Sequence, residues 1–192
     1  YISSAGTYGD EIEYLKKVYK AVGGLDIQLV VRPYPSEKRR GVHKRRNAFY
    51  KSAESSRVTF IPRKGSRPSS EEAAQLFYDT IYHSFAYLGI CSSGMIDSML
   101  IGRPGITLLD DYYNSIQSYA PQFKQLLVAG ALNIAKDIAE LRSIIENLRN
   151  GKDGLVLKRR GFIKQYLRPN GIDISAAKSL ADEIEKIAYE QK

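Results

Sequence analysis

Residues 91–106, CSSGMIDSMLIGRPGI, lie between two short apolar runs, YLGI at 87–90 and ITLL at 106–109. Apolar side chains recur at helical spacing inside the segment: Met95, Ile96, Met99 and Leu100. The tripeptide GRP then ends the helical pattern, because Gly and Pro interrupt helices. The segment therefore predicts a strand, a tight turn, a helix, a second turn and a second strand.

The start of this expected helix has the residue types of an anion site. Ser92, Ser93 and Gly94 stand where free backbone N–H groups and the positive end of the helix dipole favour a phosphate. Asp97 lies one turn further along, where a carboxylate can reach the hydroxyl groups of a ribose or a sugar. Ser and Gly are also common N-cap residues, so an ordinary capped helix is the alternative.

The composition is that of a globular protein. The chain has 192 residues, of which 43% are hydrophobic and 26% are charged, and this length suffices for one α/β domain with a buried core. No apolar run approaches the ~20 residues that a membrane-spanning helix needs. The single cysteine, Cys91, excludes a disulfide within the chain and fits a reducing compartment, so we expect a cytoplasmic location.

The chain carries a formal net charge of +8. Such a surplus favours anionic partners, namely phosphorylated ligands, nucleic acid or an anionic membrane surface, and the last would place the protein at the periphery of the inner membrane. Basic residues gather at 37–46, EKRRGVHKRR, and at 158–168, KRRGFIKQYLR. Solvated loops or helix faces are the alternative explanation of both clusters. The only histidines, His43 and His83, have no Cys or Glu partners at ligand spacing, so we expect no metal.

Helical and strand patterns alternate along the chain. Helices are expected at 11–22, 44–53, 71–85, 94–101, 121–129, 137–148, 155–167 and 176–189. Strands are expected at 1–4, 26–32, 57–62, 87–90, 106–109 and 130–135, and DDYYN at 110–114 is expected to end a strand. Repeated alternation predicts an α/β fold: a Rossmann-like, doubly wound parallel sheet of five to six strands, with helices on both faces and extra C-terminal helices.

We expect residues 1–192 to form one such domain, on which residues 155–192 pack as a helical tail. The chain begins without Met, and its first residues, YISS, have the pattern of a strand end. The domain is therefore expected to be the C-terminal half of a longer two-domain protein.

The order of elements resembles the C-terminal, nucleotide-sugar-binding half of GT-B glycosyltransferases. It is similar also to the UDP-N-acetylglucosamine 2-epimerases and to the CDP-glycerol and capsule-polysaccharide transferases. Residues 91–108 resemble the strand, Ser/Gly turn, acidic helix and GKP signature of these families, with Arg103 in place of the Lys. VVRPYPSE at 30–37 resembles their strand that ends in a basic residue and His-Pro, with Tyr34 in place of the His. RVTFIP at 57–62 fits the segment that flanks the base.

The resemblance implies a nucleotide-sugar donor as the ligand, with no metal and no further cofactor. Positive and N–H groups at the strand ends would offset the charge of the leaving diphosphate. The nucleotide and phosphate contacts expected on this basis are Gly6, Gly9, Arg32, Arg63, Lys64, Ser92, Ser93 and Gly94. The ribose or sugar contacts expected are Asp97, Asp110 and Asp111. Surface ion pairing of Arg32, solvated loop positions for Arg63 and Lys64, and turn formation by the two last aspartates are the structural alternatives.

The function implied is donor binding in a bacterial glycosyltransferase that builds surface or capsular polysaccharide. The acceptor would bind an N-terminal domain, the catalytic residues are not assigned, and the isolated domain is expected to be inactive. An epimerase-like enzyme of the same fold is one alternative. A basic nucleic-acid-binding module is another, since the 14 Tyr permit base stacking, although no nucleic-acid motif is present. The phosphate-binding and hydrolase motifs GxxxxGK[ST], GxGxxG and GxSxG are also absent.

Overall fold

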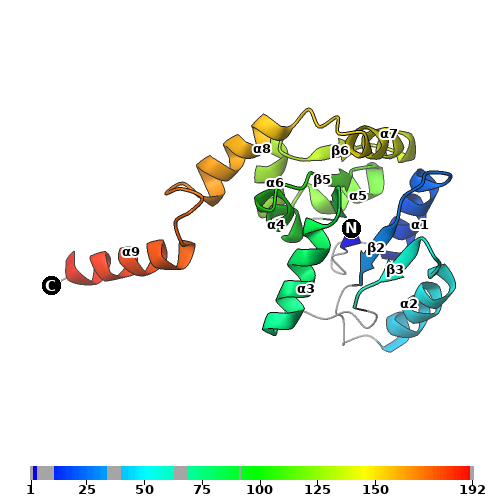
Figure 1. Ribbon diagram of the computed structural model, residues 1–192, viewed down its shortest axis with the longest axis horizontal. Helices are drawn as coiled ribbons and strands as arrows, with labels where there is room; N and C mark the ends of the chain where they lie inside the picture. The colour runs from blue at the N-terminus through cyan, green and yellow to red at the C-terminus, as the bar shows by residue number, and fades with distance from the viewer. Residues whose placement is uncertain (1, 4–10, 34–39, 63–68, 91, 191–192) are drawn as a thin grey trace.

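The computed structural model describes residues 2–3, 11–33, 40–62, 69–90 and 92–190. Its centre is one parallel sheet of six strands in the order β3-β2-β1-β4-β5-β6 (Figure 1). The strands are β1 (Ile2–Ser3), β2 (Leu29–Arg32), β3 (Val58–Phe60), β4 (Tyr87–Gly89), β5 (Gly105–Leu108) and β6 (Asn133–Ala135). This order is that of a doubly wound sheet, so the predicted fold class is confirmed.

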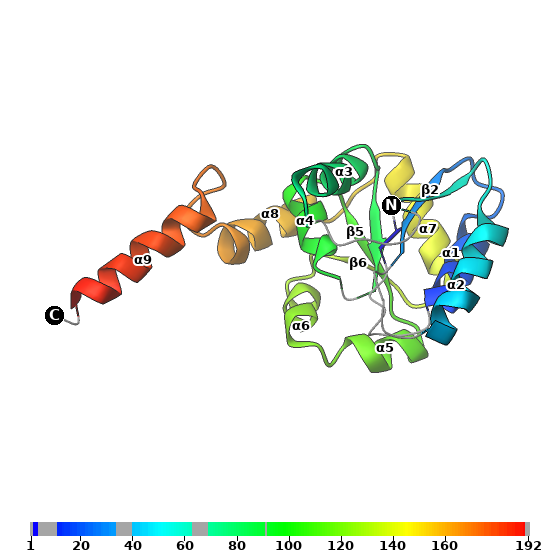
Figure 2. The same ribbon diagram turned by 90° about the horizontal axis from the view of Figure 1, so that it is seen from below.

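Helices follow the strands and cover both faces of the sheet (Figures 1 and 2). Those in the described residues are α1 (Glu11–Val22), α2 (Arg40–Ala53), α3 (Glu71–Tyr82), α4 (Gly94–Leu100), α5 (Asp111–Gln117), α6 (Pro121–Val128), α7 (Ile138–Arg149), α8 (Val156–Phe162) and α9 (Ala176–Glu190). Residues Ile163–Leu167 extend α8 as a π-helical turn, η1. The expected helix at 11–22 is confirmed to the residue, whereas α2 begins earlier than the expected residue 44.

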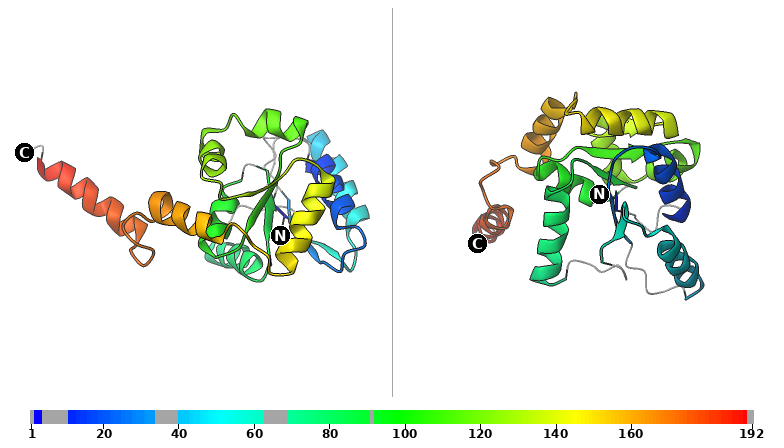
Figure 3. Two further views of the ribbon diagram at one scale, coloured as in Figure 1. Left: turned by 90° about the horizontal axis from the view of Figure 1, so that it is seen from above. Right: turned by 45° about the vertical axis from the view of Figure 1, so that its right-hand side comes forward.

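The two faces of the sheet bury two separate hydrophobic clusters. On one face α1 and α7 pack side by side, and α7 crosses in front of the sheet in the left view of Figure 3. On the other face α3, α4, α6 and α8 enclose a second cluster. Neighbouring residues of β4 pack into different clusters: Tyr87 belongs to the second cluster and Leu88 to the first. This alternation follows from the period of two along a strand and explains why β4 reads as a continuous apolar run.

A buried polar network joins the carboxyl ends of β4 and β5. The hydroxyl of Tyr14, on α1, donates to the carbonyl of Gly89 at 3.1 Å, and burial holds the pKa of Tyr14 well above its usual value. The hydroxyl of Thr107 lies 3.2 Å from the same carbonyl and 3.2 Å from Oε1 of Gln117, while Nε2 of Gln117 donates to the carbonyl of Leu108. These bonds tie α1 and α5 to the strand ends that border the candidate site.

Helix α5 corrects the interpretation of residues 110–114 as a strand end without a helix. The side chain of Asp110 accepts a hydrogen bond from the backbone N–H of Tyr113 at 3.0 Å, which is an N-cap interaction. Tyr113 is fully buried and packs edge-on against Tyr14. The acidic pair therefore begins a helix.

The C-terminal tail packs on the domain only through its first part. In α8, Phe162 enters the second cluster, and the buried guanidinium of Arg159 pairs with the carboxylate of Asp153. No residue of α9 is buried, and Figures 1 and 2 show this helix extending away from the sheet. The expectation that all of residues 155–192 pack on the domain is thus corrected for α9.

Thr107→Val should lower the free energy of unfolding by about 1–3 kcal/mol. The substitution keeps the shape of the side chain but removes its hydroxyl, whose one proton is donated to the buried carbonyl of Gly89 or to Oε1 of Gln117. Urea denaturation followed by circular dichroism measures the loss. The same substitution at Thr59, exposed on β3, is the control and should stay within about 0.5 kcal/mol of the parent protein. Equal effects at the two positions would contradict a structural role for the network.

Candidate functional site

The strand order places a topological switch between β1 and β4. Connections after these two strands run to opposite faces of the sheet, and ligands of open α/β sheets bind in the crevice formed there. Of the residues predicted to line it, Gly6, Gly9, Arg63 and Lys64 lie outside the described residues. The described part of the edge next to the switch includes the ends of β1, β2, β4 and β5 and the starts of α1, α4 and α5.

The turn from β4 into α4 is held from below by Tyr87. Its hydroxyl lies 3.1 Å from Oγ of Ser92, and the same Oγ accepts the backbone N–H of Gly94 at 3.2 Å. A Cβ at position 94 would lie 2.2 Å from the Tyr87 hydroxyl and 2.7 Å from its Cζ. Since Tyr87 is fully buried, only glycine fits at the start of α4. Sequence reasoning did not identify Tyr87, although its place at the start of the YLGI run is the signal that marks it as a strand residue beneath the turn.

The backbone N–H groups at this turn are partly used within the turn itself. Those of Met95 and Ile96 donate to the carbonyls of Ser92 and Ser93, at 3.0 and 2.8 Å. The exposed polar group is instead the hydroxyl of Ser93, which stands at the N-cap position of α4 but forms no capping hydrogen bond. Among the described residues of the turn, Ser93 therefore has a hydroxyl that can donate a hydrogen bond to a phosphate oxygen.

Asp97 lies one helical turn beyond Ser93, and the two side chains therefore share a face of α4. It is half-buried, and burial raises the pKa of its carboxyl. No side chain or backbone group in the described residues donates a hydrogen bond to this carboxylate. A carboxylate that loses solvent without gaining a donor is poised to accept hydrogen bonds from the hydroxyl groups of a ligand.

Asp110 and Asp111 follow β5 but differ in what their side chains do. Asp110 caps α5 and also pairs with Nζ of Lys17 on α1. Asp111 is exposed in the first turn of α5. The side chain of Asp110 thus already has two partners within the fold, whereas Asp111 stands at the same edge with an exposed side chain.

Arg32 ends β2 but turns away from bulk solvent. Its side chain is only 6% exposed, and its guanidinium carbon lies 5.0 Å from the ring centroid of Phe77 on α3. Arg32 is therefore not a solvated surface side chain. Its place at the end of β2 puts Arg32 at the carboxyl edge of the sheet, where the sequence predicts a phosphate contact.

Arg103, which stands at the Lys position of the GKP signature, is not near the start of α4. It follows the C-terminal end of that helix, donates to the carbonyl of Tyr82 and lies over the Tyr82 ring at 5.3 Å. Its described contacts join the ends of α3 and α4. We therefore assign Arg103 to packing between these helices.

Metal ligands do not gather in the part of the chain that the structure describes, where no three of the His, Cys, Asp and Glu side chains come together. His83 is exposed after α3. In the same residues, no helix combines the length and the apolar character required to cross a membrane.

Comparison with known proteins identifies the fold. No protein-family model and no curated protein matches the sequence. Among solved structures, the calicheamicin glycosyltransferase CalG4 matches with a TM-score of 0.59 and 15% sequence identity, over 96% of this chain and 41% of that one. The UDP-GlcNAc 2-epimerase of Methanocaldococcus jannaschii, solved in complex with UDP-GlcNAc and UDP, matches with a TM-score of 0.52 and 16% identity, over 86% of this chain and 44% of that one.

This chain spans less than half the length of either protein. At such identities the likeness establishes the fold. The protein has the α/β fold of one domain of a GT-B glycosyltransferase or of a UDP-GlcNAc 2-epimerase, which confirms the resemblance inferred from the sequence.

Gly94→Ala should destabilise the protein by about 1–3 kcal/mol, because the added methyl group overlaps the buried ring of Tyr87. Urea denaturation measures the change. Gly154→Ala is the matched control, since a Cβ at position 154 meets nothing within 4 Å, and it should change stability by no more than about 0.5 kcal/mol. Parent-like stability of Gly94→Ala would contradict the close packing of this turn.

Asp97→Asn should raise the Tm at pH 7, and the gain should shrink as the pH falls toward 4. A raised pKa in the folded state means that the fold binds this proton more tightly than the unfolded chain does. Protonation of Asp97 therefore stabilises the fold fully below the unfolded-state pKa of about 4. This stabilisation is lost as the pH rises through the pKa of Asp97 in the folded protein. Thermal denaturation from pH 4 to pH 8 measures it. Asp182→Asn, on the exposed face of α9, should show no such pH-dependent gain. A gain of equal size at pH 4 and pH 7 would contradict the effect of burial.

Proposed function

We propose that this protein is the donor-binding domain of a glycosyltransferase and that it binds a nucleotide sugar beside β4 and α4. The observation that carries the proposal is the pairing of Ser93 and Asp97 on one face of α4 at the switch point. One residue offers an exposed hydroxyl donor, and the other offers a half-buried carboxylate acceptor. A nucleotide sugar carries the matching groups, because its phosphate oxygens would accept from Ser93 and its sugar hydroxyls would donate to Asp97.

Close packing beneath the start of α4 supports this chemistry. Tyr87 packs against Gly94 and meets Ser92, which limits the reorganisation that phosphate binding at Ser93 would need. Arg32, buried at the end of β2, supports the proposal as a cation at the same edge of the sheet. During transfer, negative charge grows on the leaving diphosphate, and preorganised donors and cations favour that transition state.

Asp97 serves the other end of the ligand. Hydrogen bonds from ribose or sugar hydroxyls would satisfy the carboxylate that burial leaves without a described donor. The bound ligand would therefore favour the ionised form of Asp97 and lower its pKa. The UDP-GlcNAc and UDP in the structure of the M. jannaschii epimerase support a nucleotide sugar as the ligand class for this fold.

We extend the proposal to the synthesis of a bacterial surface polysaccharide. Its support is the resemblance of residues 91–108 to the capsule-polysaccharide and CDP-glycerol transferases, together with the basic cluster at 158–168. Lys158, Arg160 and Lys164 of this cluster are exposed, so they are available to an anionic acceptor or membrane surface. An epimerase of the same fold would bind the same class of donor, and the M. jannaschii enzyme is the observation that favours this second candidate.

Nucleotide binding tests what both candidates share. In thermal-shift and calorimetric titrations with UDP, CDP, CMP, GDP, ADP and their sugars, one nucleotide should raise the Tm of the parent protein at both low and high salt. Ser93→Ala and Asp97→Ala should each weaken its binding by about tenfold or more, because each removes a charged or charge-assisted hydrogen bond worth about 1.5–3 kcal/mol.

Ser179→Ala and Asp182→Ala on α9 are the matched controls and should bind like the parent protein. Equal losses in the site variants and the controls would contradict the assignment of α4. Binding of nucleic acid that falls steeply with salt, without a response to any nucleotide, would replace the proposal by the nucleic-acid-binding alternative.

A further inference from the structure

The surface formed by α6 and α8 carries basic residues without acidic ones. Residues 121–129 and 155–168 contain six Lys and Arg side chains and no Asp or Glu, whereas the whole chain has 29 basic and 21 acidic residues. Lys158, Arg160 and Lys164 are exposed and have no ion pair within the described residues. This surface therefore favours an anionic partner.

Two aliphatic side chains stand out from the same surface. Leu157, in the first turn of α8, is 79% exposed, and Val128, at the end of α6, is 81% exposed. At 3.6 residues per turn, Lys158 and Arg160 lie on either side of Leu157 around the helix. We call Val128, Leu157, Lys158 and Arg160 the α6–α8 corner.

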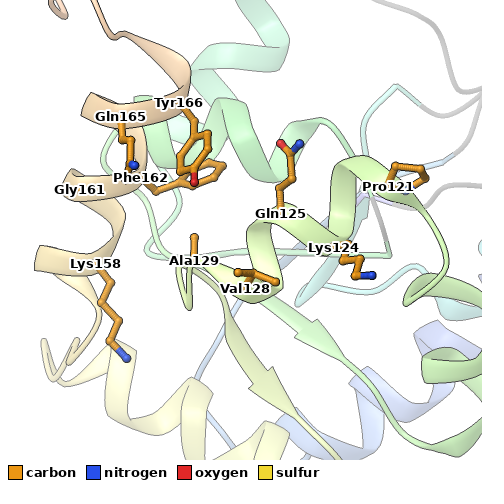
Figure 4. Close-up of a pocket in the computed structure, with 10 residues that line it drawn as sticks. All are labelled: Pro121, Lys124, Gln125, Val128, Ala129, Lys158, Gly161, Phe162, Gln165 and Tyr166. Carbon is orange, nitrogen blue, oxygen red and sulfur yellow. The ribbon is translucent and has the colours of Figure 1, made fainter.

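The α6–α8 corner lies at the edge of the sheet where the strands begin. Val128 is the last residue of α6, and the turn that follows leads into the start of β6 at Asn133. Lys158 reaches that turn, because its Cδ lies 3.4 Å from the position that a Cβ of Gly130 would take. Figure 4 shows Val128 and Lys158 on the facing walls of the groove between α6 and α8. The proposed donor site is at the opposite edge, where the strands end, so a domain that completes the donor crevice would cover that edge and leave this corner exposed.

We propose that the α6–α8 corner binds the anionic surface of a lipid bilayer. Leu157 and Val128 would enter the boundary between the headgroups and the acyl chains, while Lys158 and Arg160 would meet the lipid phosphates. Apolar side chains among Lys and Arg are the pattern of surfaces that lie on membranes without spanning them. The inference rests on the proposed function, which names an anionic acceptor or a membrane surface for the basic cluster, and it commits to the membrane.

The aliphatic side chains distinguish a bilayer from other anionic partners. Nucleic acid and acidic glycans also attract Lys158 and Arg160, but they have no apolar phase that would remove Val128 and Leu157 from water. Neither of these two residues has the aromatic ring on which an unpaired base stacks. A bilayer matches both parts of the corner, because it presents charge at its surface and hydrocarbon directly beneath.

The acidic side chains of α9 lie far from this corner. The 7 residues of α8 and the 5 residues of η1 separate the start of α8 from the connection to α9. At a rise of about 1.5 Å per residue these turns span roughly 15 Å, whereas charges are screened over about 8 Å at physiological ionic strength. Figure 1 shows α9 leaving from the end of α8 opposite to its start. Repulsion between α9 and anionic lipids therefore acts weakly at the corner.

Vesicle co-sedimentation tests the proposal. The parent protein should bind vesicles of equal parts phosphatidylglycerol and phosphatidylcholine, and should bind pure phosphatidylcholine vesicles at least about tenfold more weakly. The charge variant Lys158→Glu/Arg160→Glu and the apolar variant Val128→Ser/Leu157→Ser should each lower the partition coefficient on the anionic vesicles by about tenfold or more. All four side chains are exposed, so circular dichroism should show parent-like folding of both variants.

Two control variants make the same changes elsewhere. Lys20→Glu/Lys51→Glu changes the net charge equally through exposed lysines of α1 and α2. Leu180→Ser/Ile184→Ser removes exposed apolar side chains from α9. Both controls should bind anionic vesicles within about twofold of the parent protein, because the attraction of a charge to a membrane falls off within a Debye length.

Three results would overturn the proposal. One is a parent protein that binds no vesicles, or a charge variant that loses no more binding than its control. Another is a loss in the charge variant without a loss in the apolar variant, which would replace the bilayer by a purely polyanionic partner such as nucleic acid. The third is a loss in the α9 variant that exceeds the loss in the corner variants, which would move the contact to α9.

A tryptophan probe reports on insertion itself. The chain has no Trp, so Leu157→Trp places a single indole at the corner. Its emission should shift to shorter wavelength on anionic vesicles, and lipids brominated in the acyl chain should quench it, because the indole leaves water at the membrane interface. Leu180→Trp on α9 is the matched control and should show neither effect. Unchanged emission of Leu157→Trp in vesicle-bound protein would contradict insertion.

Nucleotide binding, measured on the same variants, separates this inference from the donor site. The corner variants should bind nucleotide like the parent protein, because the corner and the turn at Ser93 lie at opposite edges of the sheet. A parent protein that binds vesicles but no nucleotide would refute the donor site and leave the membrane contact standing. A parent protein that binds nucleotide but no vesicles would refute the membrane contact alone.

Discussion

The packing of the Tyr87 ring beneath Gly94 is the constraint on which the candidate site depends. Tyr87 begins β4, is fully buried between the sheet and the helices of one face, and leaves no room for a Cβ where α4 starts. Its hydroxyl also meets Ser92, so one side chain sets both the position and the hydrogen bonding of the turn. Two residues later, the carbonyl of Gly89 is bonded by Tyr14 from the opposite face. Contacts from both hydrophobic clusters therefore meet at β4, next to the turn that carries the exposed hydroxyl of Ser93.

Two of the described aspartates have partners within the fold, and a third is a candidate ligand-binding acid. Asp110 has an N-capping bond and an ion pair with Lys17, and Asp153 is paired with the buried Arg159. Their charge is compensated within the fold, so each contributes to stability. Asp97 loses solvent without a described donor, and burial raises its pKa. A group that the fold leaves uncompensated costs stability, and binding of a hydroxyl-rich ligand would offset that cost.

The sequence was sufficient to predict the sheet, because buried parallel strands and amphipathic helices leave distinct periodicities. It also indicated the turn at residues 92–94 and the acid at 97. It did not indicate Tyr87, since its role depends on a contact between residues seven positions apart that forms only when β4 lies beneath α4. Helix α5 was missed because an acidic pair after a strand reads equally well as a turn or as an N-cap. The burial of Arg32 and the exposure of α9 depend on tertiary packing, which periodicity does not encode.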